Sequence, residues 1–210
     1  LSLHSQTNLK AKACTSYSQQ GRKIVFSCDD GTKLSMDILS SSVVKIWFDP
    51  AGTFVRENES FAVVNEELEK MEEIHVNNEP SCYEIYTSKL RIRLNKTPMK
   101  LQIFDKWQKL LFIDFKEMGH VSEAAATKSY KMLRKDEQFY GLGEKTGPLN
   151  RRGRSYKMWN SDRPCYSTTE DPLYKSIPFF MSNYQYGTFL DISYKSEFKF
   201  GPETEENYSF

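Results

Sequence analysis

The sequence predicts an all-β protein, an antiparallel β-sandwich with few short helices. The first observation is a series of short apolar runs, many of them alternating apolar and polar residues, that turn-forming residues separate. The second is the content of 14 Phe, 12 Tyr and 3 Trp in 210 residues, because large flat side chains suit pleated sheets. No linker rich in Pro, Gly or Ser divides the chain, so we expect residues 1–210 to form a single β-sandwich domain.

The clearest element is a hairpin near the N-terminus. Residues 24–28 (IVFSC) and 34–38 (LSMDI) flank the turn Asp29-Asp30-Gly31, and the second run alternates as a half-buried strand does. Similar patterns predict further strands at residues 44–48, 90–94, 99–103, 111–113, 179–181, 188–192 and 198–200. Helix signals are weaker. Residues 65–71 (NEELEKM) predict a short surface helix, whereas residues 122–126 are too few to propagate one.

Composition argues against several classes of function. The 29 basic and 28 acidic residues give a net charge of +1, so we expect neither nucleic acid nor a membrane as a partner. The basic cluster at residues 151–154 (RRGR) is expected to be a solvated turn. The longest apolar run, residues 110–113, is far shorter than the ~20 residues of a membrane helix.

Cysteines and histidines are widely scattered. Their positions are Cys14, Cys28, Cys82 and Cys165, and His4, His75 and His120. No pair has the C-x-x-C or H-x-x-x-H spacing of a redox or metal motif, so we expect no metal and no cofactor. Disulfide pairing stays open.

A glycine-rich run at residues 139–147 (FYGLGEKTG) invites comparison with phosphate-binding loops. Its spacing, G-x-G-x-x-x-G, fits neither the dinucleotide fingerprint nor the Walker loop, and the turn formers that follow cannot start the required helix. We therefore interpret Gly141 and Gly143 as permissive backbone at a strand end or bulge. Glu144 either anchors a neighbouring loop or is simply solvated.

The sequence shows no self-sufficient active site. It contains no G-x-S-x-G elbow, no H-E-x-x-H motif, and no cysteine with a nearby histidine to activate it. A carboxylate pair for glycoside hydrolysis cannot be recognised from spacing, because the fold brings such pairs together. Residue patterns alone therefore lead no further than a β-sandwich protein.

The order of motifs between residues 136 and 201 resembles one family. FYGLGE at residues 139–144, WNSD at 159–162 and YKSIPF at 174–179 follow one another in this stretch. The same order is typical of the N-terminal β-sandwich of glycoside hydrolase family 31, the α-glucosidase and α-xylosidase family. The resemblance is strong over residues 81–201 and weak before residue 60.

The resemblance implies that the chemistry lies in another domain. In family 31 a (β/α)8 barrel follows the sandwich and hydrolyses the substrate with retention, using one aspartate as nucleophile and another as acid/base. A barrel takes ~250 residues, so we expect this chain to be a fragment truncated before its catalytic domain, with no catalytic residue and no activity of its own. The implied partners are a carbohydrate substrate, an α-glucoside or α-xyloside, and the C-terminal catalytic barrel.

The resemblance also implies where the sandwich contacts substrate. A loop of the family's sandwich reaches over the barrel mouth, and the aspartate of its Trp-Asn-x-Asp signature, here Asp162, binds sugar hydroxyls. We expect Trp159, Asn160 and Arg163 to contribute beside it, Trp159 by stacking on a sugar face. Two alternatives stay open, because Asp162 could merely cap a turn and Trp159 could belong to the core. Residues 165–171 (CYSTTED) leave glucose and xylose preference undecided.

Three functions therefore compete. The leading hypothesis is a non-catalytic N-terminal domain of a retaining α-glycosidase. The second is a free-standing carbohydrate-binding β-sandwich, and the third is a purely structural sandwich that contacts no ligand. The length of the parent reading frame, titration with α-glucosides and replacement of Asp162 distinguish them.

Overall fold

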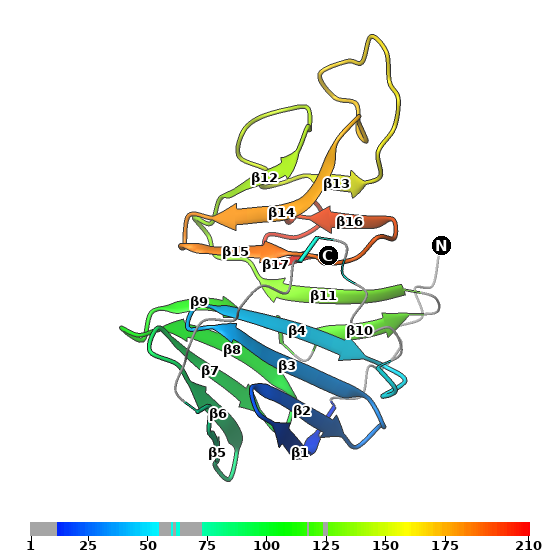
Figure 1. Ribbon diagram of the computed structural model, residues 1–210. Helices are drawn as coiled ribbons and strands as arrows, with labels where there is room; N and C mark the ends of the chain where they lie inside the picture. Colours follow the sequence, from blue (N-terminus) through cyan, green and yellow to red (C-terminus); the bar gives the residue numbers. More distant parts are fainter. Residues whose placement is uncertain (1–11, 55–59, 61, 64–72, 117, 124–125) are drawn as a thin grey trace, which may run out of the picture.

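The structure is a computed structural model that describes residues 12–54, 60, 62–63, 73–116, 118–123 and 126–210 (Figure 1). Within these residues all regular elements are strands, in four antiparallel sheets. This confirms the predicted all-β, sandwich class. The surface helix expected at residues 65–71 lies outside the described residues, and the described part contains no helix that could cross a membrane.

The nine strands between residues 14 and 113 form what we call the N-terminal sandwich, the lower half of Figure 1. Its sheets have strand orders β1-β2-β3-β4 and β5-β6-β7-β8-β9, so every strand pairs with its sequence neighbour. The strands are β1 (Cys14–Gln20), β2 (Lys23–Cys28), β3 (Lys33–Ser40), β4 (Val43–Asp49), β5 (Val76–Asn78), β6 (Cys82–Tyr86), β7 (Leu90–Asn95), β8 (Lys100–Asp105) and β9 (Leu110–Ile113).

Period-two alternation builds the core of this sandwich. In β2 every second residue is buried, and the expected hairpin is confirmed by the pairing of Ile24 with Met36 and of Phe26 with Leu34. Both sheets supply the buried side chains, which are mostly aliphatic or sulfur-containing: Cys14, Ile24, Phe26, Cys28, Leu34, Met36, Ile38, Ile74, Tyr83, Ile85, Ile92, Leu94, Met99 and Leu101. None of the four cysteines is in a disulfide.

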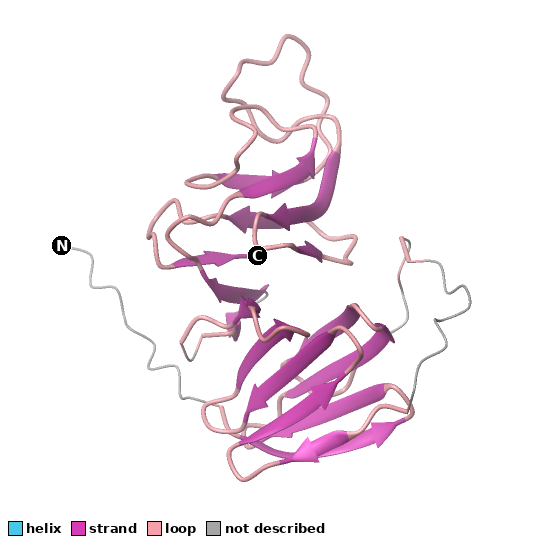
Figure 2. Cartoon of the chain, turned by 90° about the vertical axis from the view of Figure 1, so that its left-hand side faces the viewer, coloured by secondary structure: helices cyan, strands magenta, loops and turns pink. Residues whose placement is uncertain are grey.

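Residues 120–209 form the C-terminal sandwich, which is stacked on the first (Figure 2). Its sheets have strand orders β10-β11-β17-β16-β13 and β12-β14-β15, so three of its six pairings join strands that are not consecutive in sequence. The strands are β10 (His120–Glu123), β11 (Ala126–Met132), β12 (Phe139–Gly143), β13 (Ser155–Met158), β14 (Ser176–Ser182), β15 (Tyr186–Phe189), β16 (Ser196–Lys199) and β17 (Asn207–Ser209).

The core of the C-terminal sandwich is mainly aromatic. Its buried members are Leu133, Phe139, Leu142, Tyr156, Met158, Phe180, Phe198, Phe200 and Tyr208. Phe139 stacks on Phe200 with ring centroids 4.4 Å apart, and Phe180 meets Phe200 edge to face at 5.1 Å. Such offset and edge-to-face contacts are the favourable arrangements of aromatic rings.

A buried ion pair joins the two sandwiches. Asp114, directly after β9, accepts a hydrogen bond from Lys131 of β11, and each side chain is only 1% exposed. The other Asp114 oxygen accepts from the amide of Leu101 in β8 at 2.8 Å. Because a buried charge is stable only when it is paired and hydrogen-bonded, this contact fixes one sandwich against the other.

One predicted strand has different bounds in the structure. The run at residues 188–192 was expected to be extended throughout, but β15 ends at Phe189. Leu190 N still donates to the carbonyl of Pro178 at 2.8 Å, whereas Ile192 N donates to the carbonyl of Leu190 at 3.0 Å. The chain therefore bends away from β14 at this point, although its apolar residues continue.

Candidate functional site

A long loop, residues 159–175, connects β13 to β14 and carries all four residues expected to bind substrate. It projects from the end of the C-terminal sandwich and forms the yellow tip of the molecule in Figure 1. Trp159 N donates to Ser176 Oγ at 3.1 Å, and Ser176 N donates to Asn160 Oδ1 at 2.8 Å. These two bonds tie the ends of the loop together, so it leaves the sheet through a closed neck.

The foot of the loop is held by a buried lysine. Lys145 Nζ donates to Asp171 Oδ1 at 2.8 Å, to the carbonyl of Lys157 at 2.5 Å and to Ser176 Oγ at 3.3 Å. Asp171 Oδ2 accepts from the amide of Lys157 at 2.6 Å. An ammonium group has three donors, and all three are used here, so the buried charge is fully satisfied. The lysine of the glycine-rich run therefore anchors this loop.

The two glycines of the same run have the conformation that we predicted. Gly141 and Gly143 have φ values of +125° and +78°, and a register shift between them marks a bulge in the pairing of β12 with β14. A Cβ on Gly141 would lie 2.6 Å from the carbonyl oxygen of Phe179, and one on Gly143 would lie 2.8 Å from that of Lys175. Only glycine fits both positions without strain.

The basic cluster at residues 151–154 is not simply a solvated turn, and that expectation was wrong. Arg151 is buried, and its guanidinium donates at 3.0–3.3 Å to three backbone carbonyls, those of Gly141, Thr146 and Pro148. Arg152 is half-buried and donates to the carbonyls of Arg134 and Glu137. Planar guanidinium groups suit such multiple acceptors, so Arg151 stabilises the loop that follows β12 and Arg152 stabilises the segment that precedes β12.

The four predicted residues lie together at the start of the loop but differ in their contacts. Asp162 is exposed and makes no hydrogen bond or ion pair with any described residue, so no turn-capping bond is present. Trp159 is 53% exposed and is not part of the core. Asn160 uses Oδ1 to close the neck, and Arg163 Nε lies 3.7 Å from Glu170 Oε1 in an exposed ion pair.

Sequence reasoning missed several residues that shape this site. Lys145 and Asp171 hold the loop foot, and Tyr166 and Tyr174 are exposed on the loop with ring centroids 6.3 Å apart. The tyrosines could have been found as aromatics beside the WNSD signature. Nothing in the spacing indicates the ion pair. Glu144, by contrast, is exposed, and its side chain contacts no described polar group.

Comparison with known proteins identifies the family. Residues 33–198 match the model of the glycosyl hydrolase 31 N-terminal galactose mutarotase-like domain. The chain belongs to this family.

The family 31 domain described here has relatives among glycosidases. It is 32% identical over 185 residues to α-glucosidase 2 of Bacillus thermoamyloliquefaciens, covering 86% of this chain and 23% of that protein. It is 31% identical over 131 residues to an α-xylosidase of Emericella nidulans, covering 50% of this chain and 16% of that protein.

A solved relative shares the fold closely. The family 31 dextranase of Flavobacterium johnsoniae, complexed with glucose, matches 95% of this chain with a TM-score of 0.91 and 58% identity. A mutant of that dextranase was solved with isomaltotriose. The match covers 25% of the dextranase chain, so this chain spans about a quarter of the length of that relative and of the α-glucosidase.

A wide groove of this family 31 domain lies elsewhere. A groove of about 1510 Å³ runs between β4 and the strands β15 and β16, and none of the four predicted residues lines it. His120 lies in its wall, stacked on Phe48. Burial and the nearby Lys131 charge lower the pKa of His120 to about 3, so the imidazole is neutral at neutral pH and not poised for proton transfer.

Among the described residues no group of three or more His, Cys, Asp or Glu could hold a metal ion.

Proposed function

We propose that this chain is the N-terminal, non-catalytic domain of a retaining α-glycosidase, and that residues 159–175 form part of the substrate pocket of a following catalytic barrel. The observation that carries the proposal is Asp162, an exposed carboxylate without a polar partner in the described structure. A carboxylate accepts hydrogen bonds from two adjacent hydroxyls, and charge-assisted bonds are about twice as strong as neutral ones. The family and the glycosidase relatives support a carbohydrate ligand.

The anchoring of the loop supports this role. Binding loses free energy when a mobile loop must be ordered, and a preorganised loop avoids that cost. Lys145 and Asp171 fix the loop foot, and the two bonds between Ser176 and the residues Trp159 and Asn160 close its neck. We infer that Asp162 is presented from a fixed base, with Trp159 and Arg163 beside it as further substrate contacts.

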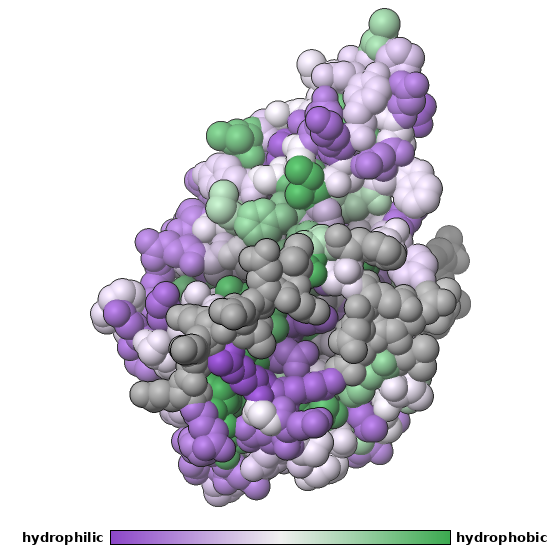
Figure 3. Space-filling view, in the orientation of Figure 1, coloured by the Kyte–Doolittle hydropathy of each residue, from purple (hydrophilic) through white to green (hydrophobic). Residues whose placement is uncertain are grey.

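An exposed apolar face supports packing on the following barrel. Ile177, Phe179 and Met181 alternate outward along β14, and Phe189 of β15 pairs with Phe179, so four large apolar side chains are exposed on one sheet face. Figure 3 shows hydrophobic side chains among polar ones in this upper part of the molecule. The face begins at Ser176, where the substrate loop ends. A barrel docked on β14 would therefore also lie beside the loop.

Replacing Asp162 tests the proposal. We expect Asp162→Ala in the full-length protein to lower kcat/KM for p-nitrophenyl α-glucoside about tenfold to hundredfold, because a charge-assisted bond worth ~1.5–3 kcal/mol is lost. Glu205→Ala is the matched control, since Glu205 is an exposed carboxylate far from the loop in sequence. Unchanged kinetics in Asp162→Ala would leave only a packing role. The 210-residue chain alone is expected to show no hydrolysis.

One observation favours a second function, that of a free-standing carbohydrate-binding module. Trp159, Tyr166 and Tyr174 expose aromatic rings on the same loop, and such rings can stack on sugars. A module binds α-glucosides through this loop without any other domain, whereas half of a composite pocket does not. Binding of maltose by the 210-residue chain that disappears in Trp159→Ala would favour the module over our proposal.

A further inference from the structure

The turn between β8 and β9 presents the most exposed of the large hydrophobic side chains in the described structure. Trp107 is 77% exposed, although it lies in a turn fixed by several hydrogen bonds. Asp105 Oδ1 accepts from the amides of Trp107 at 2.9 Å and Lys109 at 2.8 Å. Gln108, at φ +67°, accepts a bond of 2.6 Å from Arg91 through its side chain. A single exposed aromatic needs no explanation, but one carried by a hydrogen-bonded turn beside a cavity is placed to contact a ligand.

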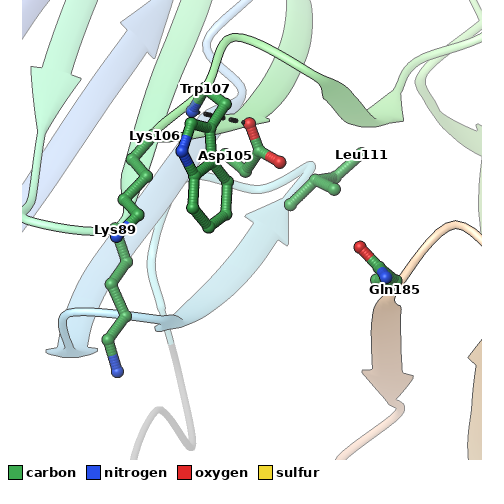
Figure 4. Close-up of a pocket in the computed structure, with 6 residues that line it drawn as sticks. All are labelled: Lys89, Asp105, Lys106, Trp107, Leu111 and Gln185. Carbon is green, nitrogen blue, oxygen red and sulfur yellow. Dashed lines mark hydrogen bonds between the residues drawn. The ribbon is translucent and has the colours of Figure 1, made fainter.

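That cavity has a volume of about 290 Å³ and lies between the two sandwiches. Lys89, Asp105, Lys106, Trp107 and Leu111 come from the N-terminal sandwich, and Gln185 comes from the β14–β15 turn. Figure 4 shows the Trp107 indole with Lys106 on one side and with Leu111 and Gln185 across the cavity on the other. Lys106 Nζ lies 4.5 Å from the indole centroid. Lys106 therefore occupies one ring face and leaves the opposite face for a ligand.

The lining combines one aromatic face with hydrogen-bonding groups of both kinds. Asp105 Oδ2 is an acceptor that the turn does not use, and the Lys89 ammonium is a donor. The Gln185 amide supplies N–H donors, while its Oε1 already accepts one bond, of 3.5 Å, from Lys109 Nζ. Two lysines and one aspartate leave little net charge, which suits a neutral ligand better than an ionised one. The volume of about 290 Å³ lies just below the range of typical ligand sites, which span about 300–1,000 Å³.

We propose that this cavity is a second carbohydrate subsite, in which one glucose ring of an α-glucan stacks on Trp107. A pyranose ring has an apolar C–H face that fits the indole and a rim of hydroxyls that needs both donors and acceptors. Asp105, Lys89 and Gln185 bind those hydroxyls. The ligand class rests on the proposed function, whereas the site depends on none of the residues of the 159–175 loop.

Titration of the 210-residue chain with isomaltotriose tests the subsite. The binding is followed by NMR. The chain contains three tryptophans, so the indole N–H signal of Trp107 can be assigned by its loss in Trp107→Ala. We expect a saturable shift of this signal, and binding at least about tenfold weaker in Trp107→Ala. Tyr194→Ala, which removes an exposed ring outside the cavity, is the matched control and should bind as the parent does. Absence of a saturable shift, or equal binding by Trp107→Ala, would overturn the subsite.

A second arm uses the full-length protein. We expect Trp107→Ala to raise KM for dextran severalfold and to leave KM for p-nitrophenyl α-glucoside unchanged, because the small substrate cannot reach two subsites. The same KM for dextran in Trp107→Ala and in the parent protein would refute the subsite. A lowered Tm of the full-length variant, with no change in the isolated chain, would instead show that another domain covers Trp107. Asp162→Ala leaves isomaltotriose binding at Trp107 unchanged, so failure of one proposal is separable from failure of the other.

Discussion

The two sandwiches differ in how far apart in sequence their paired strands lie. Within each sheet of the N-terminal sandwich the strands pair in the order in which they follow along the chain, whereas in the C-terminal sandwich β11 pairs with β17 and β13 pairs with β16. Neighbouring strands need only short turns, but distant partners leave long connections between them. Residues 159–175 connect β13 to β14, which lie in different sheets. The candidate site is therefore carried by a connection between the two sheets of the C-terminal sandwich.

Their cores differ in a related way. The aliphatic core of the N-terminal sandwich contains few polar atoms, whereas the aromatic core of the C-terminal sandwich surrounds Glu137, which is fully buried. Ser182 Oγ and the Tyr186 hydroxyl each donate to Glu137 Oε1 at 2.7 Å. A buried carboxylate is stable only with such partners. The C-terminal sandwich therefore relies on a polar network around this fully buried carboxylate.

The largest expected effect comes from the ion pair between the sandwiches. Replacing one member leaves the other charge buried and unpaired, so we expect Lys131→Ala to lower the free energy of unfolding by about 3–5 kcal/mol. Urea unfolding followed by tryptophan fluorescence and by circular dichroism measures the loss. Lys116→Ala is the control, because Lys116 and Glu206 form an exposed pair at 3.1 Å that contributes about 0–1 kcal/mol.

The same experiment tests our prediction that the chain is a single domain. The structure has two separate cores, so this stays a prediction. If both sandwiches form one cooperative unit, the two probes should report one transition in the parent chain and in Lys131→Ala. Two transitions in the parent chain would contradict a single domain. A loss below about 1 kcal/mol in Lys131→Ala would show that the buried pair does not join the sandwiches.

A smaller effect is expected at the glycines of the C-terminal sandwich. Gly143 and Gly153 both have φ +78°, but a Cβ on Gly143 meets the carbonyl of Lys175, whereas one on Gly153 meets nothing within 4 Å. Alanine at either position must adopt the left-handed conformation, which lowers the free energy of unfolding by about 1–2 kcal/mol. We expect Gly143→Ala to cost ~1–2 kcal/mol more than Gly153→Ala in urea unfolding, because the overlap with β14 adds strain. An equal loss of unfolding free energy in the two variants would show that the bulge between β12 and β14 shifts to accommodate the added Cβ without strain.

The sequence predicted some strands and missed others, and the burial and pairing of each strand explain the difference. β2, β3, β7 and β8 could be predicted because one face of each is buried and turns separate them. β1 (CTSYSQQ) could not, because it is mostly exposed and its residues show no apolar alternation. The pairing of β11 with β17 was also hidden, since nothing local specifies a distant partner.

The candidate site was visible only in part, for a similar reason. Asp162 and Trp159 were predicted to bind substrate from an ordered set of motifs, which stays a prediction, and the structure places both on one exposed loop. Asn160 was predicted to bind substrate, yet its Oδ1 is used within the protein. The partnership of Lys145 with Asp171 depends on tertiary contact between segments 26 residues apart, which neither propensity nor spacing reveals.

The smallest effect is expected at an ion pair of the N-terminal sandwich. Burial raises the pKa of Glu84, but hydrogen bonds from Arg91, Tyr86 and Arg93 outweigh it and lower the pKa to about 2, from an ordinary 4.5. Because the folded-state pKa is the lower one, the stabilisation is complete above pH 4.5 and is lost as the pH falls toward 2. We therefore expect Glu84→Gln to cost ~1.5–3 kcal/mol at neutral pH and almost nothing near pH 2. Glu203→Gln removes an exposed pair with Lys199 and should cost at most about 0.5 kcal/mol. A cost of Glu84→Gln that does not change with pH would contradict the charge-based account and leave shape alone as the cause.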